Sequence, residues 1–121
     1  MTRSIEIMDT TLRDGEQTSG VSYSPKEKLT IAKLLLEELK VDRIEVASAR
    51  VSDGELNSVK DITTWAKENN HLQKIEVLTF IDNNKSIEWL IESGCKVQNL
   101  LTKGSLNHLE HQLKKNTKGT L

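Results

Sequence analysis

The sequence predicts an α/β fold in which short parallel strands alternate with helices. Runs rich in β-branched residues recur along the chain, and segments with apolar residues at helical spacing lie between them. The connections between these segments are short, which favours a parallel sheet with right-handed crossovers. No linker or low-complexity stretch interrupts the pattern, so residues 1–121 are expected to contain no internal domain boundary.

The first predicted element is a strand that begins at Ile5 and leads into a polar loop at Gly15. Its apolar positions are Ile5 and Ile7, followed later by Leu12. Asp-Gly is a common turn signal, and Asp14 directly precedes Gly15. The strand is therefore expected to end at this turn.

A helix is predicted from Ser24 to Leu39. Ser24 is placed as the N-cap, Pro25 takes the first helical position, and Glu27 completes a capping box. Apolar residues then recur at helical spacing, with the lysine and glutamate residues expected on the opposite side. This pattern is typical of a helix that packs against a sheet.

The remaining elements follow the same alternation, up to a C-terminal tail without periodicity. In chain order they are a strand at residues 43–48, a helix opened by a second capping box from Ser52 to Glu55 and ended at Asn69–Asn70, a strand at 74–81, a helix at 87–91 stopped by Gly94, a strand at 96–101 and a helix capped by Ser105.

The composition excludes several functional classes. Charged residues make up 29% of the chain and the net charge is -1, so no overall field would recruit nucleic acid or an anionic membrane. No stretch approaches the roughly 18 apolar residues of a membrane span, and the N-terminus lacks the apolar segment of a signal peptide. A single cysteine, Cys95, fits a reducing cytosol and is expected to be buried. We therefore expect a cytoplasmic protein that binds neither nucleic acid nor membranes.

The residues after the first strand carry the clearest chemical signal. Asp14 offers hard carboxylate oxygens suited to Mg²⁺, Mn²⁺ or, with histidine partners, Zn²⁺. Arg13 offers a permanently charged donor fork that can hold a carbonyl or a carboxylate. The alternative is a solvated Asp-Gly turn with surface ion pairs.

A longer match accompanies these two residues. Residues 9–17 read DTTLRDGEQ, residues 41–50 read VDRIEVASAR, and residues 99–105 read NLLTKGS. Together they resemble the acyl-CoA aldol and Claisen family of 2-isopropylmalate, homocitrate and citramalate synthases, with hydroxymethylglutaryl-CoA lyase as a relative. The resemblance covers nearly the whole chain and leans toward citramalate synthase and the short 2-isopropylmalate synthases.

The resemblance implies a fold and a reaction. The fold is a (β/α)8 TIM barrel of roughly 200 to 250 residues, of which this chain would be the first half. In the reaction, acetyl-CoA loses a methyl proton and the resulting enolate attacks the ketone of a small 2-oxo acid, either 2-oxoisovalerate or pyruvate. Water then hydrolyses the thioester, in leucine or isoleucine biosynthesis. Such chemistry needs a divalent metal ion (Mg, Mn or Zn), a cation near the oxygens that gain charge, and a general base.

By similarity to this family, Asp14 is the metal ligand and Arg13 the electrostatic stabiliser. Gln17 is implied as a substrate-binding neighbour. Leu78 and Leu101 match apolar positions that line the pocket for the side chain of the oxo acid. Two leucines would narrow that pocket toward the methyl group of pyruvate, although a methylene or two contributes only a few kcal/mol to such a choice.

The carboxyl ends of parallel barrel strands meet at one mouth, where reacting groups lie. Glu45 is a candidate for the second layer of the metal site, and its alternative role is an ion pair with Arg43 or Arg50. The clusters expected at the mouth are Arg13, Asp14 and Gln17 after the first strand; Glu45, Ser48 and Arg50 at the second; Leu78 and Thr79 at the third; and Leu101, Thr102 and Lys103 at the fourth.

The family also carries a His-x-His pair on a later strand, which completes its metal site. His71, His108 and His111 do not match that pair, and the general-base glutamate and substrate tyrosine are expected beyond Leu121. We therefore expect the chain to be an N-terminal fragment that is inactive alone, from a full-length enzyme that forms a homodimer. Two alternatives remain open, which are a C–C lyase of the hydroxymethylglutaryl-CoA type and a non-catalytic half-barrel that serves as an assembly module.

Overall fold

A parallel sheet organises the computed structural model, which describes residues 4–102. The sheet has four strands in the order β1-β2-β3-β4, and every neighbouring pair is parallel. This sequential order is that of consecutive strands in a (β/α)8 barrel, so the α/β prediction and its half-barrel form are confirmed. The strands are β1 (Met8–Asp9), β2 (Arg43–Ser48), β3 (Ile75–Phe80) and β4 (Val97–Leu101).

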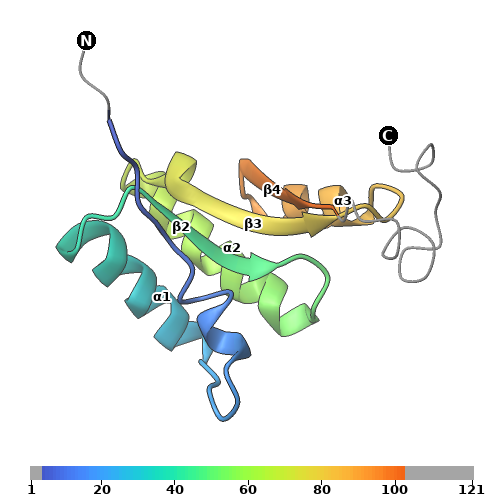
Figure 1. The fold of residues 1–121 in the computed structure, drawn as a ribbon, viewed down its shortest axis with the longest axis horizontal. Helices are drawn as coiled ribbons and strands as arrows, with labels where there is room; N and C mark the ends of the chain where they lie inside the picture. Colours follow the sequence, from blue (N-terminus) through green and yellow to red (C-terminus); the bar gives the residue numbers. More distant parts are fainter. Residues whose placement is uncertain (1–3, 103–121) are drawn as a thin grey trace.

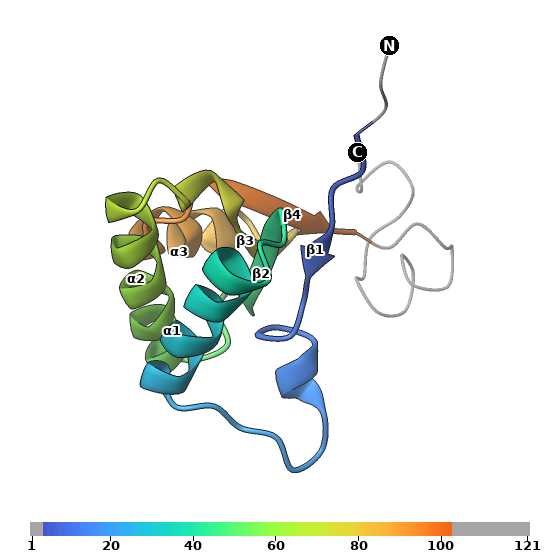
Figure 2. The ribbon, with the colours of Figure 1, turned by 90° about the vertical axis from the view of Figure 1, so that its left-hand side faces the viewer.

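The helices cover one face of this sheet (Figures 1 and 2). They are α1 (Pro25–Lys33), which continues into a π-helical turn η2 (Leu34–Glu38), α2 (Asp53–Glu68) and α3 (Lys85–Ser93). Two 3₁₀ turns, η1 (Gly15–Gln17) and η3 (Leu72–Lys74), lie in the connections. None of the helices in the described residues is both long enough and apolar enough to cross a membrane.

The hydrophobic core lies between the helices and the sheet. Its central residues are less than 1% exposed, and burial of one such side chain contributes about 1.5–3 kcal/mol. They come from β2, α2 and β3, and they are Ile44, Val46, Val59, Ile62, Ile75 and Val77. The opposite face of the sheet is not covered by any described element (Figure 2).

The first strand is shorter than its sequence pattern predicts. Only Met8–Asp9 pairs as a strand, while Ile5 is 87% exposed and Ile7 is 62% exposed. Ile7 is nevertheless held in place, because its backbone N–H donates to the Asp42 carboxylate at 2.7 Å. Leu12 is buried as expected, but in the turn after the strand.

The helix predicted from Ser24 begins as expected and ends differently. Ser24 and Glu27 form the reciprocal capping box, with the Ser24 hydroxyl 3.2 Å from the Glu27 backbone nitrogen. The last turn is π-helical, and the backbone N–H of Leu39 donates to the Leu34 carbonyl five residues before it. This wider turn rotates the apolar stripe, so Leu34 and Leu39 are exposed instead of packed.

The prediction that the lysines of this helix face away from the core is wrong at Lys28. Lys28 is 2% exposed, and Ala32 and Leu35, four and seven residues further along, are buried as well. The predicted capping box of the next helix is also only half formed. Ser52 accepts from the Glu55 backbone N–H at 3.1 Å, but the Glu55 carboxylate binds Lys28.

The second half of the described chain agrees closely with the predictions. Helix α2 ends at Glu68 with Asn69 as its C-cap, as expected, and strands β3 and β4 begin one residue later than predicted. Gly94 ends α3 with φ of 84°, in the left-handed conformation that favours glycine. Cys95 is buried, and this burial raises the pKa of its thiol. The helix predicted from Ser105 lies outside the described residues.

Asp82 connects α3 to the end of β2. Its carboxylate accepts from the Ser86 backbone N–H at 2.9 Å, from the Ser86 hydroxyl at 2.6 Å and from the Arg50 guanidinium at 2.9 Å. Burial raises the pKa of Asp82, but the Ser86 hydrogen bonds and the Arg50 charge together outweigh it and lower the pKa overall. The ionised carboxylate therefore stabilises the fold.

The sign of this effect sets a pH dependence. Since the folded pKa lies below the unfolded value of about 3.9, the stabilisation is complete above that value and is lost as the pH falls through the folded pKa. Asp82→Asn is expected to lower Tm by a few degrees at neutral pH, with the difference disappearing in acid. Thermal unfolding by circular dichroism across pH measures it, with the exposed Asp61→Asn as control. A difference that persists in acid would contradict the assignment.

Candidate functional site

The turn after β1 holds Arg13 at the carboxyl end of the sheet. The Thr10 carbonyl accepts from the backbone N–H groups of Arg13, Asp14 and Gly15 at 3.2, 2.8 and 3.1 Å. Leu12, next to Arg13, is 1% exposed and belongs to the hydrophobic core. The three hydrogen bonds to the Thr10 carbonyl and the burial of Leu12 therefore fix the backbone conformation at Arg13.

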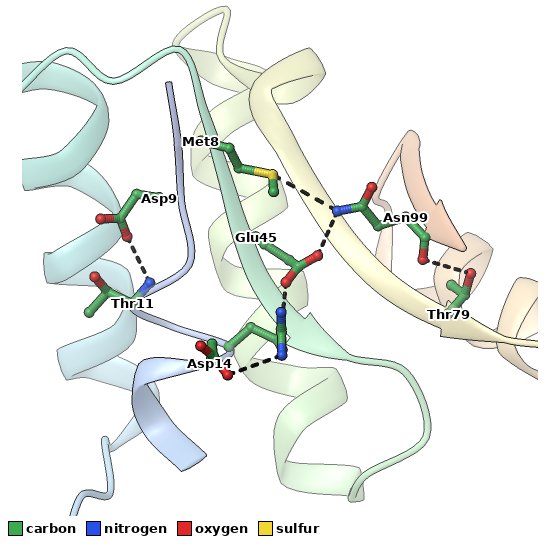
Figure 3. A network of polar contacts seen from close by, with 8 residues as sticks. Met8, Asp9, Thr11, Asp14, Glu45, Thr79 and Asn99 are labelled. Carbon is green, nitrogen blue, oxygen red and sulfur yellow. Dashed lines mark hydrogen bonds and ion pairs between the residues drawn. The ribbon is translucent and has the colours of Figure 1, made fainter. Parts of the chain in front are cut away.

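The side chain of Arg13 binds a buried carboxylate on the open face of the sheet. Its Nε donates to Oε1 of Glu45 at 2.5 Å, and the amide of Asn99 donates to Oε2 of Glu45 at 2.6 Å. Figure 3 shows Glu45 and Asn99 directed toward each other from β2 and β4 across β3. Glu45 is 1% exposed, so these two partners satisfy a charge that would otherwise be costly to bury.

The alternative role given for Glu45, an ion pair with Arg43 or Arg50, is not observed. Arg43 pairs with Glu76, and Arg50 pairs with Asp82. Glu76, the partner of Arg43, is the residue of β3 that is in register with Glu45. Arg50 lies beyond the end of β2 and has a positive φ of 65°. Its side chain reaches Asp82 in the loop after β3.

This arrangement leaves Arg13 able to bind an anion. Its Nε is taken by Glu45, while Nη1 lies 3.4 Å from Oδ1 of Asp14, which is a weak contact for a charged pair. The Arg13 side chain is 21% exposed. A guanidinium fixed on one side and open on the other is suited to hold a carboxylate or a developing negative charge.

Asp14 presents its carboxylate to solvent, with a side chain that is 63% exposed. It is therefore open to a metal ion. However, no group of three or more His, Cys, Asp or Glu residues within residues 4–102 is arranged to hold one. His71 precedes β3 and so lies at the amino end of the sheet, far from the carboxyl ends. His108 and His111 are outside the described residues.

A cavity of about 230 Å³ lies beside this turn. Arg13 and Gln17 line it together with Ser48 at the end of β2, so the structure brings these three predicted residues to one place. The other lining residues come from the same turn, from β2 and the loop after it, and from the starts of α1 and α2, and they are Leu12, Glu16, Lys28, Ala47, Val51 and Glu55.

Leu78 and Leu101 lie elsewhere. Leu78 is in register with Ser48 on one side and with Asn99 on the other, so it stands on the open face near the Glu45 network. Leu101 is the last residue of β4, is 40% exposed and pairs with Phe80. Neither leucine belongs to the lining of the cavity beside Arg13.

Sequence reasoning missed two residues that organise the site. Asn99 lies within a stretch used for the family resemblance, but nothing in its surroundings indicates that its amide binds Glu45. Lys28 carries a readable signal, since it shares the buried helical stripe of Ala32 and Leu35. Its partners Glu16 and Glu55, at 23% and 15% side-chain exposure, come from two other segments.

Comparison with known proteins gives relatives along most of the chain. A 2-isopropylmalate synthase of Staphylococcus carnosus is 41% identical over 115 residues, which cover 91% of this chain and 21% of that protein. An (R)-citramalate synthase of Methanocaldococcus jannaschii is 59% identical over 59 residues, covering 49% and 12%. A homocitrate synthase of Methanopyrus kandleri is 55% identical over 56 residues, covering 46% and 14%.

The matched relatives are much longer than this chain. Where the match is long, the chain spans about a fifth of the length of the curated relatives, at 21% of each. The HMGL-like family model matches residues 4–120, which include the strands and helices described in residues 4–102 and the Arg13 turn. With the parallel half-barrel and this match, the chain belongs to the HMGL-like family.

Proposed function

We propose that this chain is the N-terminal part of an acetyl-CoA-dependent 2-oxo acid synthase. The proposed reaction is a Claisen condensation, in which the enolate of acetyl-CoA attacks the ketone of a small 2-oxo acid. Support comes from relatives named as isopropylmalate, citramalate and homocitrate synthases. The observation that carries the proposal is the position of Arg13, fixed by buried Glu45 at the carboxyl end of the sheet.

Arg13 has the role of electrostatic stabiliser in this proposal. Its free guanidinium edge donates to the oxo acid oxygens, which gain negative charge as the C–C bond forms. The Glu45 carboxylate orients the guanidinium through Nε and also accepts from the Asn99 amide. Gln17 lines the same cavity and positions substrate through its amide.

Asp14 is the proposed ligand of a divalent metal ion, with Mg, Mn and Zn as the candidates. Such an ion would act as a Lewis acid toward the ketone and carboxylate oxygens of the oxo acid. The exposed carboxylate fits this role, and the remaining ligands would come from outside residues 4–102.

Two substrates are proposed for the oxo acid, 2-oxoisovalerate and pyruvate. Use of 2-oxoisovalerate would place the enzyme in leucine biosynthesis, and use of pyruvate would place it in isoleucine biosynthesis. The full-length enzyme is proposed to be a cytoplasmic homodimer. Leu78 stands beside the Glu45 network, on the face that a completed barrel would enclose. With Leu101 it would narrow the pocket, which favours pyruvate by a small margin.

The test is the activity of the full-length enzyme. Release of free CoA from acetyl-CoA is followed with a thiol reagent for each oxo acid, and the product is identified by mass spectrometry. Condensation with either acid supports the proposal, and the ratio of the two kcat/KM values identifies the substrate. Cleavage of a hydroxyacyl-CoA without condensation would instead support a lyase. The 121-residue chain alone is expected to show no turnover.

Replacement of Asp14 with asparagine tests the metal role in the same enzyme. Loss of metal-assisted charge stabilisation, which contributes several kcal/mol, is expected to lower kcat/KM by about 100-fold or more. Asp61→Asn, an exposed acid on α2, is the matched control and should leave kcat/KM unchanged. Equal activity of the two variants would rule out Asp14 as a metal ligand.

A further inference from the structure

Lys28 is a buried lysine with two carboxylate partners. It lies in the first turns of α1 and is 2% exposed. Its Nζ is 2.5 Å from Oε2 of Glu16 and also binds Oε1 of Glu55. A lysine is almost never buried unless it is paired, so the position of its ammonium is determined by these two acids.

The three residues come from three separate segments. Glu16 belongs to η1, directly before Gln17, and Glu55 belongs to the first turn of α2. All three line the cavity of about 230 Å³ that Arg13 and Gln17 also line. One ammonium thus joins the Arg13 turn to the two helices that flank it.

The segment from Gly15 to Val21 has few other attachments. Its backbone hydrogen bonds are local: Gly15 donates to the Thr10 carbonyl at 3.1 Å, Gln17 to Asp14 at 3.1 Å, Thr18 to Gly15 at 3.2 Å and Val21 to Thr18 at 3.0 Å. Within residues 4–102, the bond between Glu16 and Lys28 is the one side-chain ion pair that connects this segment to the helices.

We propose that Lys28 is a positioning residue for the Arg13 turn. Through Glu16 it holds η1 against α1, and through Glu55 it holds α1 against α2, so that Gln17 and Arg13 face the same cavity. The consequence for catalysis rests on the proposed function, whereas the attachment of the turn does not. Without the ammonium, the carboxylates of Glu16 and Glu55 would repel each other. Glu16 would then move away from the helices together with η1.

Hydrogen exchange of the 121-residue chain, followed by NMR, tests this attachment. The readouts are the exchange rates of the Gln17 and Val21 amides and the resonance of the Arg13 Nε–H group. Lys28→Met and Glu16→Gln are expected to accelerate exchange of both amides by about tenfold, with the amides of β2 and β3 changed less than about twofold. The Arg13 Nε–H resonance should shift in the same two variants.

Conservative and control variants separate positioning from general stability. Lys28→Arg keeps the charge and should restore slow exchange, while Lys26→Met, on an exposed lysine of the same helix, should change nothing. Glu16→Gln provides the test if Lys28→Met does not fold, because Glu16 is partly exposed. Unchanged exchange in Glu16→Gln, or equal acceleration in the turn and in β2 and β3, would overturn the proposal.

The outcome is independent of the enzyme assay. A full-length enzyme that does not condense acetyl-CoA with an oxo acid would overturn the proposed function and leave the attachment by Lys28 standing. If condensation occurs and the exchange result holds, Lys28→Met in that enzyme should lower kcat more than it raises KM, because the turn is misplaced for the reaction.

Discussion

Glu45→Ala is expected to lower the free energy of unfolding by about 3 kcal/mol. The substitution removes a carboxylate that is 1% exposed and accepts from Arg13 at 2.5 Å and from Asn99 at 2.6 Å. It leaves the Arg13 guanidinium without its main partner and the Asn99 amide unsatisfied. Removal of one member of a buried pair costs about 3–5 kcal/mol, and the lower end applies because Arg13 is 21% exposed and regains some solvation.

Urea unfolding of the chain measures this loss. The matched control is Glu92→Ala, which removes an exposed carboxylate 3.8 Å from Lys60 and is expected to cost less than about 0.5 kcal/mol. Equal effects of the two substitutions would show that the Glu45 network does not hold the open face of the sheet together.

A substitution at the same residue that keeps its size should affect the proposed reaction. In the full-length enzyme, Glu45→Gln is expected to lower kcat/KM by about 100-fold, because a small displacement of Arg13 removes its alignment with the reacting oxygens. Glutamine keeps the size of the side chain, so stability should fall less than in Glu45→Ala. A variant that loses stability and keeps full activity would separate Glu45 from the positioning of Arg13.

Gly94→Ala is expected to destabilise the chain by about 2–3 kcal/mol. Gly94 has φ of 84°, where an alanine is strained by about 1–2 kcal/mol. A Cβ at this position would lie 2.9 Å from Oγ1 of Thr63, closer than real contacts allow. Thr63 has little room to move, because its hydroxyl donates to the Ser93 carbonyl at 2.7 Å in the packed interface of α2 and α3.

Gly54→Ala provides the matched control. A Cβ there has Oγ of Ser52 at 3.9 Å as its near neighbour, and the residue is exposed in the first turn of α2. Alanine restricts the unfolded chain and favours the helix, so a gain of about 0.5–1 kcal/mol is expected. The two Tm values, measured by circular dichroism, should move in opposite directions. A tolerated Gly94→Ala would show that α3 can shift away from α2.

Local signals were sufficient for most of the secondary structure. Ser24, Pro25 and Glu27 begin α1 as predicted, since a capping box is formed by residues within four positions of one another. Gly94 ends α3 for an equally local reason, because few residues other than glycine adopt a positive φ. The β-branched runs predicted β2 and β3 within one residue at each end.

The same local reasoning failed where a distant charge competed. Glu55 was expected to complete a capping box with Ser52, but the buried ammonium of Lys28, 27 residues away in the chain, takes its carboxylate. Likewise, the alternative role given for Glu45 was an ion pair with Arg43 or Arg50, close to it in sequence, whereas Glu45 binds Arg13 and Asn99, which are 32 and 54 residues away. A buried charge takes the partner that folding brings to it, and spacing along the chain does not reveal that partner.

In the candidate site too, local sequence signals predicted some features and contacts between distant residues decided the others. The residue types and the turn at Arg13, Asp14 and Gly15 were readable in the chain, because a strand end, an Asp-Gly turn and a nine-residue family match coincide there. Only the packing of β1, β2 and β4 in one parallel sheet decided that Arg13 would be held by Glu45 and Asn99. The physical reason is that parallel register places side chains from separate strands on one face, where a carboxylate in low dielectric must find its counter-charge.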